Sequence, residues 1–109
     1  ENWLQTFEGQ IDAVVGQNDE MALGALQALE GKGLTDRDDI PVVGVDAISD
    51  ALQAVKDGRL NATVFQDAKG QGAQSVEVAV KYLKGEPIEK EYWIPFQLVT
   101  AENVNEFME

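Results

Sequence analysis

The sequence has no cysteine and no histidine among its 109 residues. These absences exclude disulfide bonds, metal sites built from thiolate or imidazole ligands, cysteine nucleophiles and serine–histidine triads. Basic residues are scarce as well, because 8 lysines and arginines stand against 20 aspartates and glutamates, for a net charge of -12. Nucleic acids and anionic membrane surfaces require a basic footprint, so we expect neither as a partner.

Motifs for phosphate binding and catalysis are missing too. There is no Walker-type loop, no GxGxxG opens a helix after a strand, and the glycine pair at Gly70–Gly72 is too short. Neither Ser49 nor Ser75 lies in a nucleophile elbow. The acidic loop at Thr35–Asp39 lacks the spacing of a calcium-binding EF-hand, and we expect it to be solvated. The sequence therefore predicts no enzyme activity and no cofactor.

The sequence also lacks a long apolar run. No stretch approaches the roughly 20 residues of a membrane span, so we do not expect the chain to be membrane-embedded. Glu1 is not a natural translation start, and Glu1–Phe7 is typical of the tail of a helix that Gly9 terminates. We therefore expect the chain to be part of a longer protein.

What the sequence does contain is a regular alternation of strand and helix patterns, with 44% hydrophobic residues. The β-branched run Ile11–Val15 predicts a buried strand. The helical spacing of Asp19–Lys32 predicts a helix whose N-cap is Asp19. Equivalent patterns predict strands at Pro41–Asp46 and Leu60–Gln66, and helices at Ile48–Lys56 and Lys69–Lys84. This alternation indicates an α/β fold with a Rossmann-like (flavodoxin-like) parallel sheet and flanking helices.

The last part of the chain departs from this alternation. Tyr92–Val99 predicts a final strand, which Pro95 confines to a sheet edge or a bulge. Thr100–Phe107 predicts a short closing helix. Trp93 and Phe96 are either platforms on which a ligand stacks or packing residues of a core or an interface.

Polar side chains end the three predicted parallel strands: Asn18, Asp46 and Gln66. Right-handed crossovers would bring the carboxyl ends of these strands to one edge of the sheet, where ligands bind in open α/β folds. A residue of this kind, taken singly, is more often a structural helix cap or turn former than a ligand group. Amide and carboxylate groups can make paired hydrogen bonds to neighbouring hydroxyls, as a sugar or polyol requires. The three residues are therefore candidate ligand-binding residues.

Four segments carry a family resemblance: GQNDEMALGALQAL, PVVGVD, ALQAVKDGRLNATVFQ and PFQLVTAENVNEF. From about Ile11 to Phe107 the chain resembles the C-terminal portion of a periplasmic sugar-binding protein of the ribose-binding type, which is the solute-binding protein of an ABC transporter. The resemblance implies two Rossmann-like lobes that a hinge joins and that close over a monosaccharide. It also implies that Asn18, Asp46 and Gln66 bond sugar hydroxyls.

The resemblance further implies a division of the chain. Residues 1–66 would form part of the C-terminal sugar-binding lobe. Residues 67–91 would form a hinge crossing and a helix that packs on the N-terminal lobe. Residues 92–109 would form the returning strand and the closing helix. The apolar face of the predicted helix at Lys69–Lys84 would be left without its partner lobe, so we also expect self-association, exchange of this segment between copies, or disorder.

The implied function is binding of a monosaccharide or polyol for a sugar ABC importer, with the ABC permease as a partner through the longer protein. The implied localisation is periplasmic, or extracellular as a lipoprotein. An alternative is the effector-binding core of a lac-repressor-type transcriptional regulator, since the same lobes occur there. That alternative requires a helix-turn-helix head, which the sequence does not contain.

Overall fold

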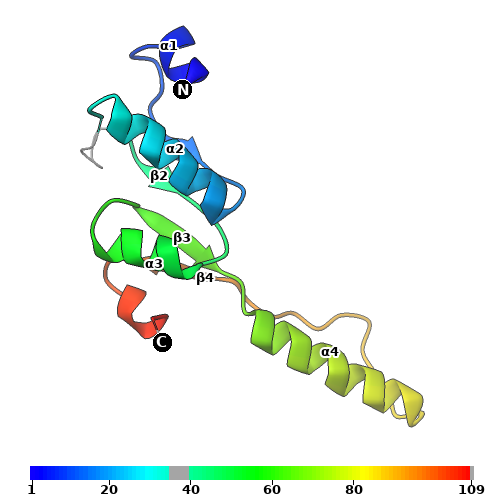
Figure 1. Ribbon diagram of the computed structural model, residues 1–109. Helices are drawn as coiled ribbons and strands as arrows, with labels where there is room; N and C mark the ends of the chain where they lie inside the picture. Colours follow the sequence, from blue (N-terminus) through cyan, green and yellow to red (C-terminus); the bar gives the residue numbers. More distant parts are fainter. Residues whose placement is uncertain (35–39, 109) are drawn as a thin grey trace. The chain divides into compact units, whose positions relative to one another are not determined.

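The computed structural model describes residues 1–34 and 40–108 (Figure 1). The predicted acidic loop at Thr35–Asp39 lies outside the described residues. The chain divides into two compact units. The first unit comprises Glu1–Phe65 and Gln97–Glu109, and the second comprises Gln66–Phe96.

The first unit is built on a four-stranded sheet in the order β1-β2-β3-β4 (Figure 1). Its strands are β1 (Val14–Val15), β2 (Val42–Val43), β3 (Ala62–Phe65) and β4 (Gln97–Thr100). The first three strands run parallel, and β4 pairs antiparallel with β3. The predicted α/β fold with a mostly parallel sheet is thus confirmed.

Two helices cover this sheet, α2 (Asp19–Gly31) and α3 (Ser49–Lys56), and they also contact each other. Both lie within two residues of their predicted bounds, because their apolar periodicity matches the faces they bury. The short helix α1 (Asn2–Thr6) precedes them, and the 3-10 turn η1 (Val104–Glu106) packs against α3. The core comprises Ala22, Leu26, Leu29, Val42, Ala51, Leu52, Ala54, Val55, Leu60, Val99 and Val104.

The two faces of the sheet are covered unequally. Val14 packs against the core and Val99 is buried, whereas the neighbouring side chains of Val15 and Leu98 are 72% and 61% exposed. Successive side chains of a strand point to opposite faces, so the helices cover one face and leave apolar side chains on the other.

The strands are shorter than predicted. Residues 11–13 extend towards β1 but have no ladder partner, since the pairing of β1 with β2 is confined to Val14 and Val15. The final strand begins at Gln97 and not at Tyr92, because β3 offers partners only to residues 97–100. A hydrophobic pattern marks residues that suit a strand, whereas the strand itself ends where its neighbour ends.

Two predictions about helices were wrong. The N-cap of α2 is Asn18, whereas Asp19 is the first residue of the helix. The predicted closing helix at Thr100–Phe107 is a single 3-10 turn. Its side chains still point inward as expected, with Val104 buried and the Phe107 ring 5.2 Å from that of Phe65.

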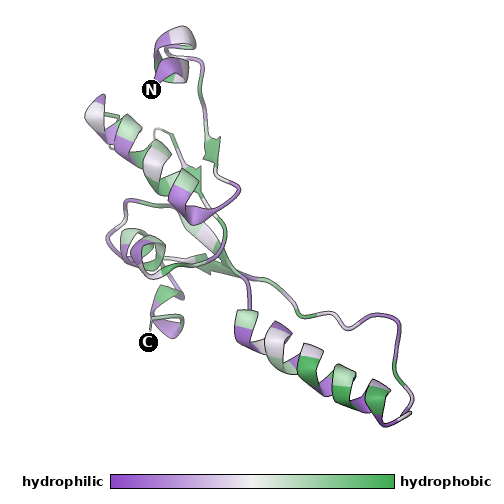
Figure 2. Cartoon of the chain, turned by 45° about the vertical axis from the view of Figure 1, so that its right-hand side comes forward, coloured by the Kyte–Doolittle hydropathy of each residue, from purple (hydrophilic) through white to green (hydrophobic). Residues whose placement is uncertain are grey.

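The second unit consists of α4 (Ala68–Leu83) and the segment that follows it. Asp67 caps the helix by accepting a hydrogen bond from the backbone N–H of Gly70 at 2.8 Å. Hydrophobic residues recur along α4 (Figure 2), yet the helix has no buried residue. The apolar face predicted for this helix is thus exposed, with Val76 at 66% and Leu83 at 82%.

Candidate functional site

Asn18 lies beyond the carboxyl end of β1 and caps α2. Its side-chain Oδ1 accepts a hydrogen bond from the backbone N–H of Met21 at 2.9 Å. This cap occupies the acceptor end of the amide and identifies which end is oxygen. The NH₂ group at the other end can only donate hydrogen bonds. Asn18 is half-buried, and its role towards a ligand stays a prediction.

Asp46 lies beyond the carboxyl end of β2 and is exposed. Its backbone N–H donates to the carbonyl of Val64 at 2.9 Å, which continues the pairing between β2 and β3. Its φ is 119°, and the φ of Ala47 is 57°. Residues with a Cβ rarely adopt this left-handed region, so the turn has an unusual backbone, which sets the direction of the Cα–Cβ bond of Asp46.

A third polar residue of this edge, Asp19, was not among the predicted site residues. Asp19 is fully buried, and its carboxylate accepts hydrogen bonds from the Thr63 hydroxyl at 2.6 Å and the Ile48 backbone N–H at 2.9 Å. A Cβ at Gly44 would overlap Asp19 Oδ1, so a glycine is required in that position. The sequence contained no signal for this burial, because an acidic residue in a first helical turn is normally exposed.

Asn18 and Asp46 lie at the same edge of the sheet. They follow the adjacent parallel strands β1 and β2, and the hydrogen bond from Ile48 to Asp19 joins the residues just beyond them. Gln66 directly follows Phe65, the last residue of β3, and is the first residue of the second unit. Its contribution to the same site stays a prediction.

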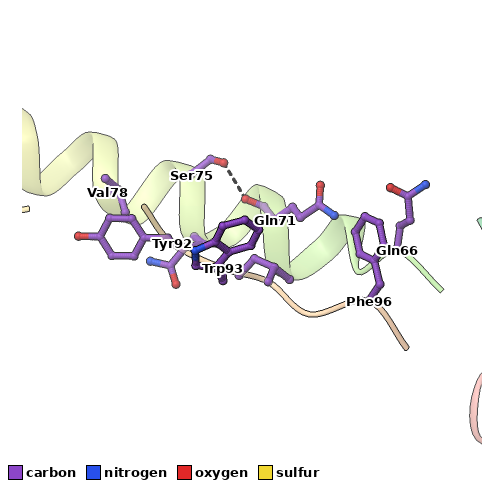
Figure 3. A pocket seen from close by; sticks show the side chains of 9 residues that line it. Gln66, Gln71, Ser75, Val78, Tyr92, Trp93 and Phe96 are labelled. Carbon is purple, nitrogen blue, oxygen red and sulfur yellow. Dashed lines mark hydrogen bonds between the residues drawn. The ribbon is translucent and has the colours of Figure 1, made fainter. Parts of the chain in front are cut away.

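The second unit contains an open groove of about 510 Å³ between α4 and the segment that includes Tyr92 and Trp93 (Figure 3). Aromatic rings dominate one side of this groove, and Trp93 and Phe96 are 85% and 57% exposed. The other side carries polar groups of α4, where the Ser75 hydroxyl donates to the carbonyl of Gln71 at 2.7 Å. Gln66 also lines the groove. This exposure contradicts core packing of Trp93 and Phe96 and leaves ligand stacking and interface packing as the two alternatives.

One ion pair of the first unit joins Arg59 and Glu30. Arg59 donates two hydrogen bonds to Glu30, at 2.8 and 2.9 Å. These hydrogen bonds lower the pKa of Glu30 and raise that of Arg59. The pair links the last turn of α2 to the turn before β3, which is a structural role.

Residues 1–34 and 40–108 hold no group of three or more acidic residues placed to bind a metal ion. Over the same residues, no helix has the length and hydrophobicity needed to cross a membrane.

Comparison with known proteins agrees with the fold. The model of the periplasmic binding protein domain matches residues 1–87. The chain is 48% identical over 96 residues to the ribose import binding protein RbsB of Salmonella typhimurium, which covers 88% of this chain and 31% of that protein. The chain belongs to the periplasmic binding protein family.

Solved structures give the same result. An ABC transporter solute binding protein from Bacillus halodurans with bound myo-inositol is 57% identical, with a TM-score of 0.85 over 97% of this chain and 36% of that one. A periplasmic solute binding protein from Actinobacillus succinogenes with bound D-allose is 31% identical, with a TM-score of 0.86 over 96% of this chain and 36% of that one. The chain spans about a third of the length of these relatives.

Proposed function

We propose that the chain carries part of the ligand site of an ABC importer's solute-binding protein, and that the ligand is a monosaccharide or polyol. The observation that carries the proposal is the pairing of a donor and an acceptor at one sheet edge. The helix cap uses the Asn18 oxygen, so its NH₂ group would donate to the ligand, and the Asp46 carboxylate would accept. A sugar hydroxyl does both, so vicinal hydroxyls suit this pair. We infer that Gln66 supplies a third group.

The first ligand to test is a cyclic polyol. The Bacillus halodurans protein, at 57% identity, was solved with myo-inositol, and the more distant relative with D-allose. Both ligands are rings of adjacent hydroxyls. We therefore rank myo-inositol before ribose and allose as the ligand of this chain's longer protein.

We further propose that the longer protein works by capture, without catalysing a reaction. Residues 1–66 belong to one lobe and residues 92–109 return to it, while residues 67–91 form a hinge crossing and pack on a second lobe. The exposed Val76 and Leu83 of α4 support this division, since a helix with an unburied apolar face requires a partner. Closure of two lobes would exclude water from the ligand. The proposed partner is an ABC permease, and the proposed localisation is periplasmic or extracellular as a lipoprotein.

Isothermal titration with myo-inositol, ribose and allose tests this proposal, using the 109-residue chain and the longer protein side by side. We expect the longer protein to bind one of them and the chain alone to bind weakly or undetectably, because one lobe cannot desolvate the ligand. Affinity of about millimolar or better for several sugars, reached by the chain alone as a monomer, would contradict the two-lobe mechanism. The absence of binding by the longer protein would contradict the function itself.

A further inference from the structure

The turn that carries Asp46 is held by hydrogen bonds to three consecutive backbone N–H groups. The N–H of Asp46 donates to the Val64 carbonyl at 2.9 Å. The next N–H, of Ala47, donates to the Thr63 hydroxyl oxygen at 3.2 Å. The third, of Ile48, donates to the Asp19 carboxylate at 2.9 Å. Two of the three acceptors are thus side chains from distant parts of the sequence.

Asp19 and Thr63 are joined in one chain of hydrogen bonds. The Thr63 hydroxyl donates its proton to Asp19 Oδ1 at 2.6 Å while its oxygen accepts from Ala47. Both residues are fully buried, so neither can touch a ligand. A buried carboxylate is costly unless hydrogen bonds satisfy it, and Asp19 receives one on each oxygen. Both carboxylate oxygens of Asp19 therefore accept hydrogen bonds from other parts of the chain, one from Thr63 and one from Ile48.

The held turn has a conformation that needs such support. The φ values of 119° at Asp46 and 57° at Ala47 are both in the region that L-residues avoid. Backbone of this kind persists where surrounding contacts over-determine it, and it occurs preferentially at functional sites. Without its acceptors, we expect the turn to relax and the Cα–Cβ bond of Asp46, which carries the carboxylate, to lose its backbone-set direction.

We propose that Asp19 and Thr63 are positioning residues that set ligand affinity through the turn at Asp46–Ile48. The proposal rests on the proposed function for its effect on affinity, but the hold on the turn can be tested without a ligand. A pre-organised acceptor avoids the ordering cost that a mobile one incurs on binding. We expect Thr63→Val to weaken affinity about tenfold, comparable to the loss of one good hydrogen bond.

The first test is amide hydrogen exchange of the 109-residue chain, measured by NMR. We expect Thr63→Val to speed exchange at Ala47 about tenfold or more relative to a reference amide, since its acceptor is gone. The reference is the N–H of Arg59, which donates to the carbonyl of Ala54 at 2.8 Å. Thr63→Ser keeps the hydroxyl and should restore protection. Unchanged exchange at Ala47 in Thr63→Val would overturn the proposal.

The second test is a double-mutant cycle on ligand affinity in the longer protein, with myo-inositol, ribose and allose as probes. If Thr63 acts through Asp46, then Thr63→Val should cost affinity in the wild-type background and almost none in Asp46→Asn. Independent, additive losses would overturn the proposal. Val104→Ala, in the core and outside this chain of hydrogen bonds, is the control for lost stability and should leave affinity unchanged.

The two tests separate the two proposals. If the wild-type longer protein binds none of the probes, the proposed function fails, and the exchange measurement still decides whether Thr63 holds the turn. If a probe binds but the cycle is additive while Ala47 loses protection, the turn is held and its role in affinity is rejected.

Discussion

At the scale of single residues, neighbouring polar side chains beyond the carboxyl end of β1 have different roles. Asn18 uses its oxygen for the helix cap, and in the proposed site its NH₂ group would donate to the ligand. Asp19, its neighbour, is fully buried and serves only the protein. The two interpretations that the sequence offered for Asn18, a helix cap and a ligand group, are therefore compatible. Each uses a different end of the same side chain.

Substitutions of Asn18 should separate these two tasks. Asn18→Asp keeps the cap and should leave the free energy of unfolding within a few tenths of a kcal/mol, whereas Asn18→Ala should lower it by about 1 kcal/mol. Both should weaken ligand binding by the longer protein about tenfold or more, because both lose the donor. Urea unfolding and isothermal titration measure the two effects. Wild-type affinity in Asn18→Asp would show that this donor is not used.

At the scale of elements, α2 packs closely against the sheet, so its first turn lies beside the carboxyl ends of β1 and β2. A Cβ at Gly16 would approach the backbone N of Ala22 to 2.7 Å, and a Cβ at Gly44 would overlap Asp19. The two glycines therefore let the first turn of the helix contact the ends of β1 and β2. Gly24, inside the same helix, has nothing within 4 Å of its Cβ position and is not needed in this way.

This contrast predicts opposite effects for the same substitution at two glycines. Gly44→Ala should lower the free energy of unfolding by about 1–3 kcal/mol, because the added methyl overpacks the contact with Asp19. Gly24→Ala should raise it by about 0.5–1 kcal/mol, because alanine is the better helix former and the space is open. Urea unfolding of both variants checks the pair. An unchanged free energy of unfolding in Gly44→Ala would mean that α2 does not pack this closely against Gly44.

The ion pair between α2 and the turn before β3 predicts a pH dependence. Arg59 lowers the pKa of Glu30 in the folded state, so the pair stabilises the fold above the unfolded pKa of about 4.5. This contribution is lost as pH falls through the lowered pKa of Glu30. The side chains of Arg59 and Glu30 are 47% and 29% exposed, so solvent screens the pair. Its contribution to the free energy of unfolding should therefore be about 0.5 kcal/mol.

Arg59→Gln provides the measurement. Its unfolding free energy should fall below that of the wild type at neutral pH, and the difference should shrink in acid once Glu30 is protonated. Glu30→Gln is the matched control and should behave like Arg59→Gln at neutral pH. A difference that grows in acid would contradict the assignment of the shift to this pair.

At the scale of the whole molecule, each unit exposes apolar surface. In the first unit Val15 and Leu98 lie on the uncovered sheet face, and in the second unit α4 exposes Val76, Val80 and Leu83. Each such side chain forgoes roughly 1.5–3 kcal/mol that burial would provide. The chain spans about a third of its relatives, and we infer that other parts of the longer protein cover these surfaces.

The chain alone should therefore self-associate through the face of α4. Sedimentation velocity should show concentration-dependent association, which Val76→Gln with Leu83→Gln should weaken by removing two exposed apolar groups. Glu77→Gln with Lys84→Gln is the matched control, because it alters the same helix without changing net charge. A monomer at all concentrations, with α4 protected from amide exchange, would contradict this expectation.

The sequence by itself determined the class of fold, the bounds of α2, α3 and α4 to within two residues, and the polar positions at the strand ends. These features depend on local periodicity and on residues close together in the chain, which a sequence displays directly. Tertiary structure alone decided how long the strands are, that Asn18 caps α2 in place of Asp19, and that the turn at Asp46 is left-handed. The physical reason is that these features depend on partners distant in the chain. Thr63, which bonds the buried Asp19, lies 44 positions away, and no local pattern specifies that contact.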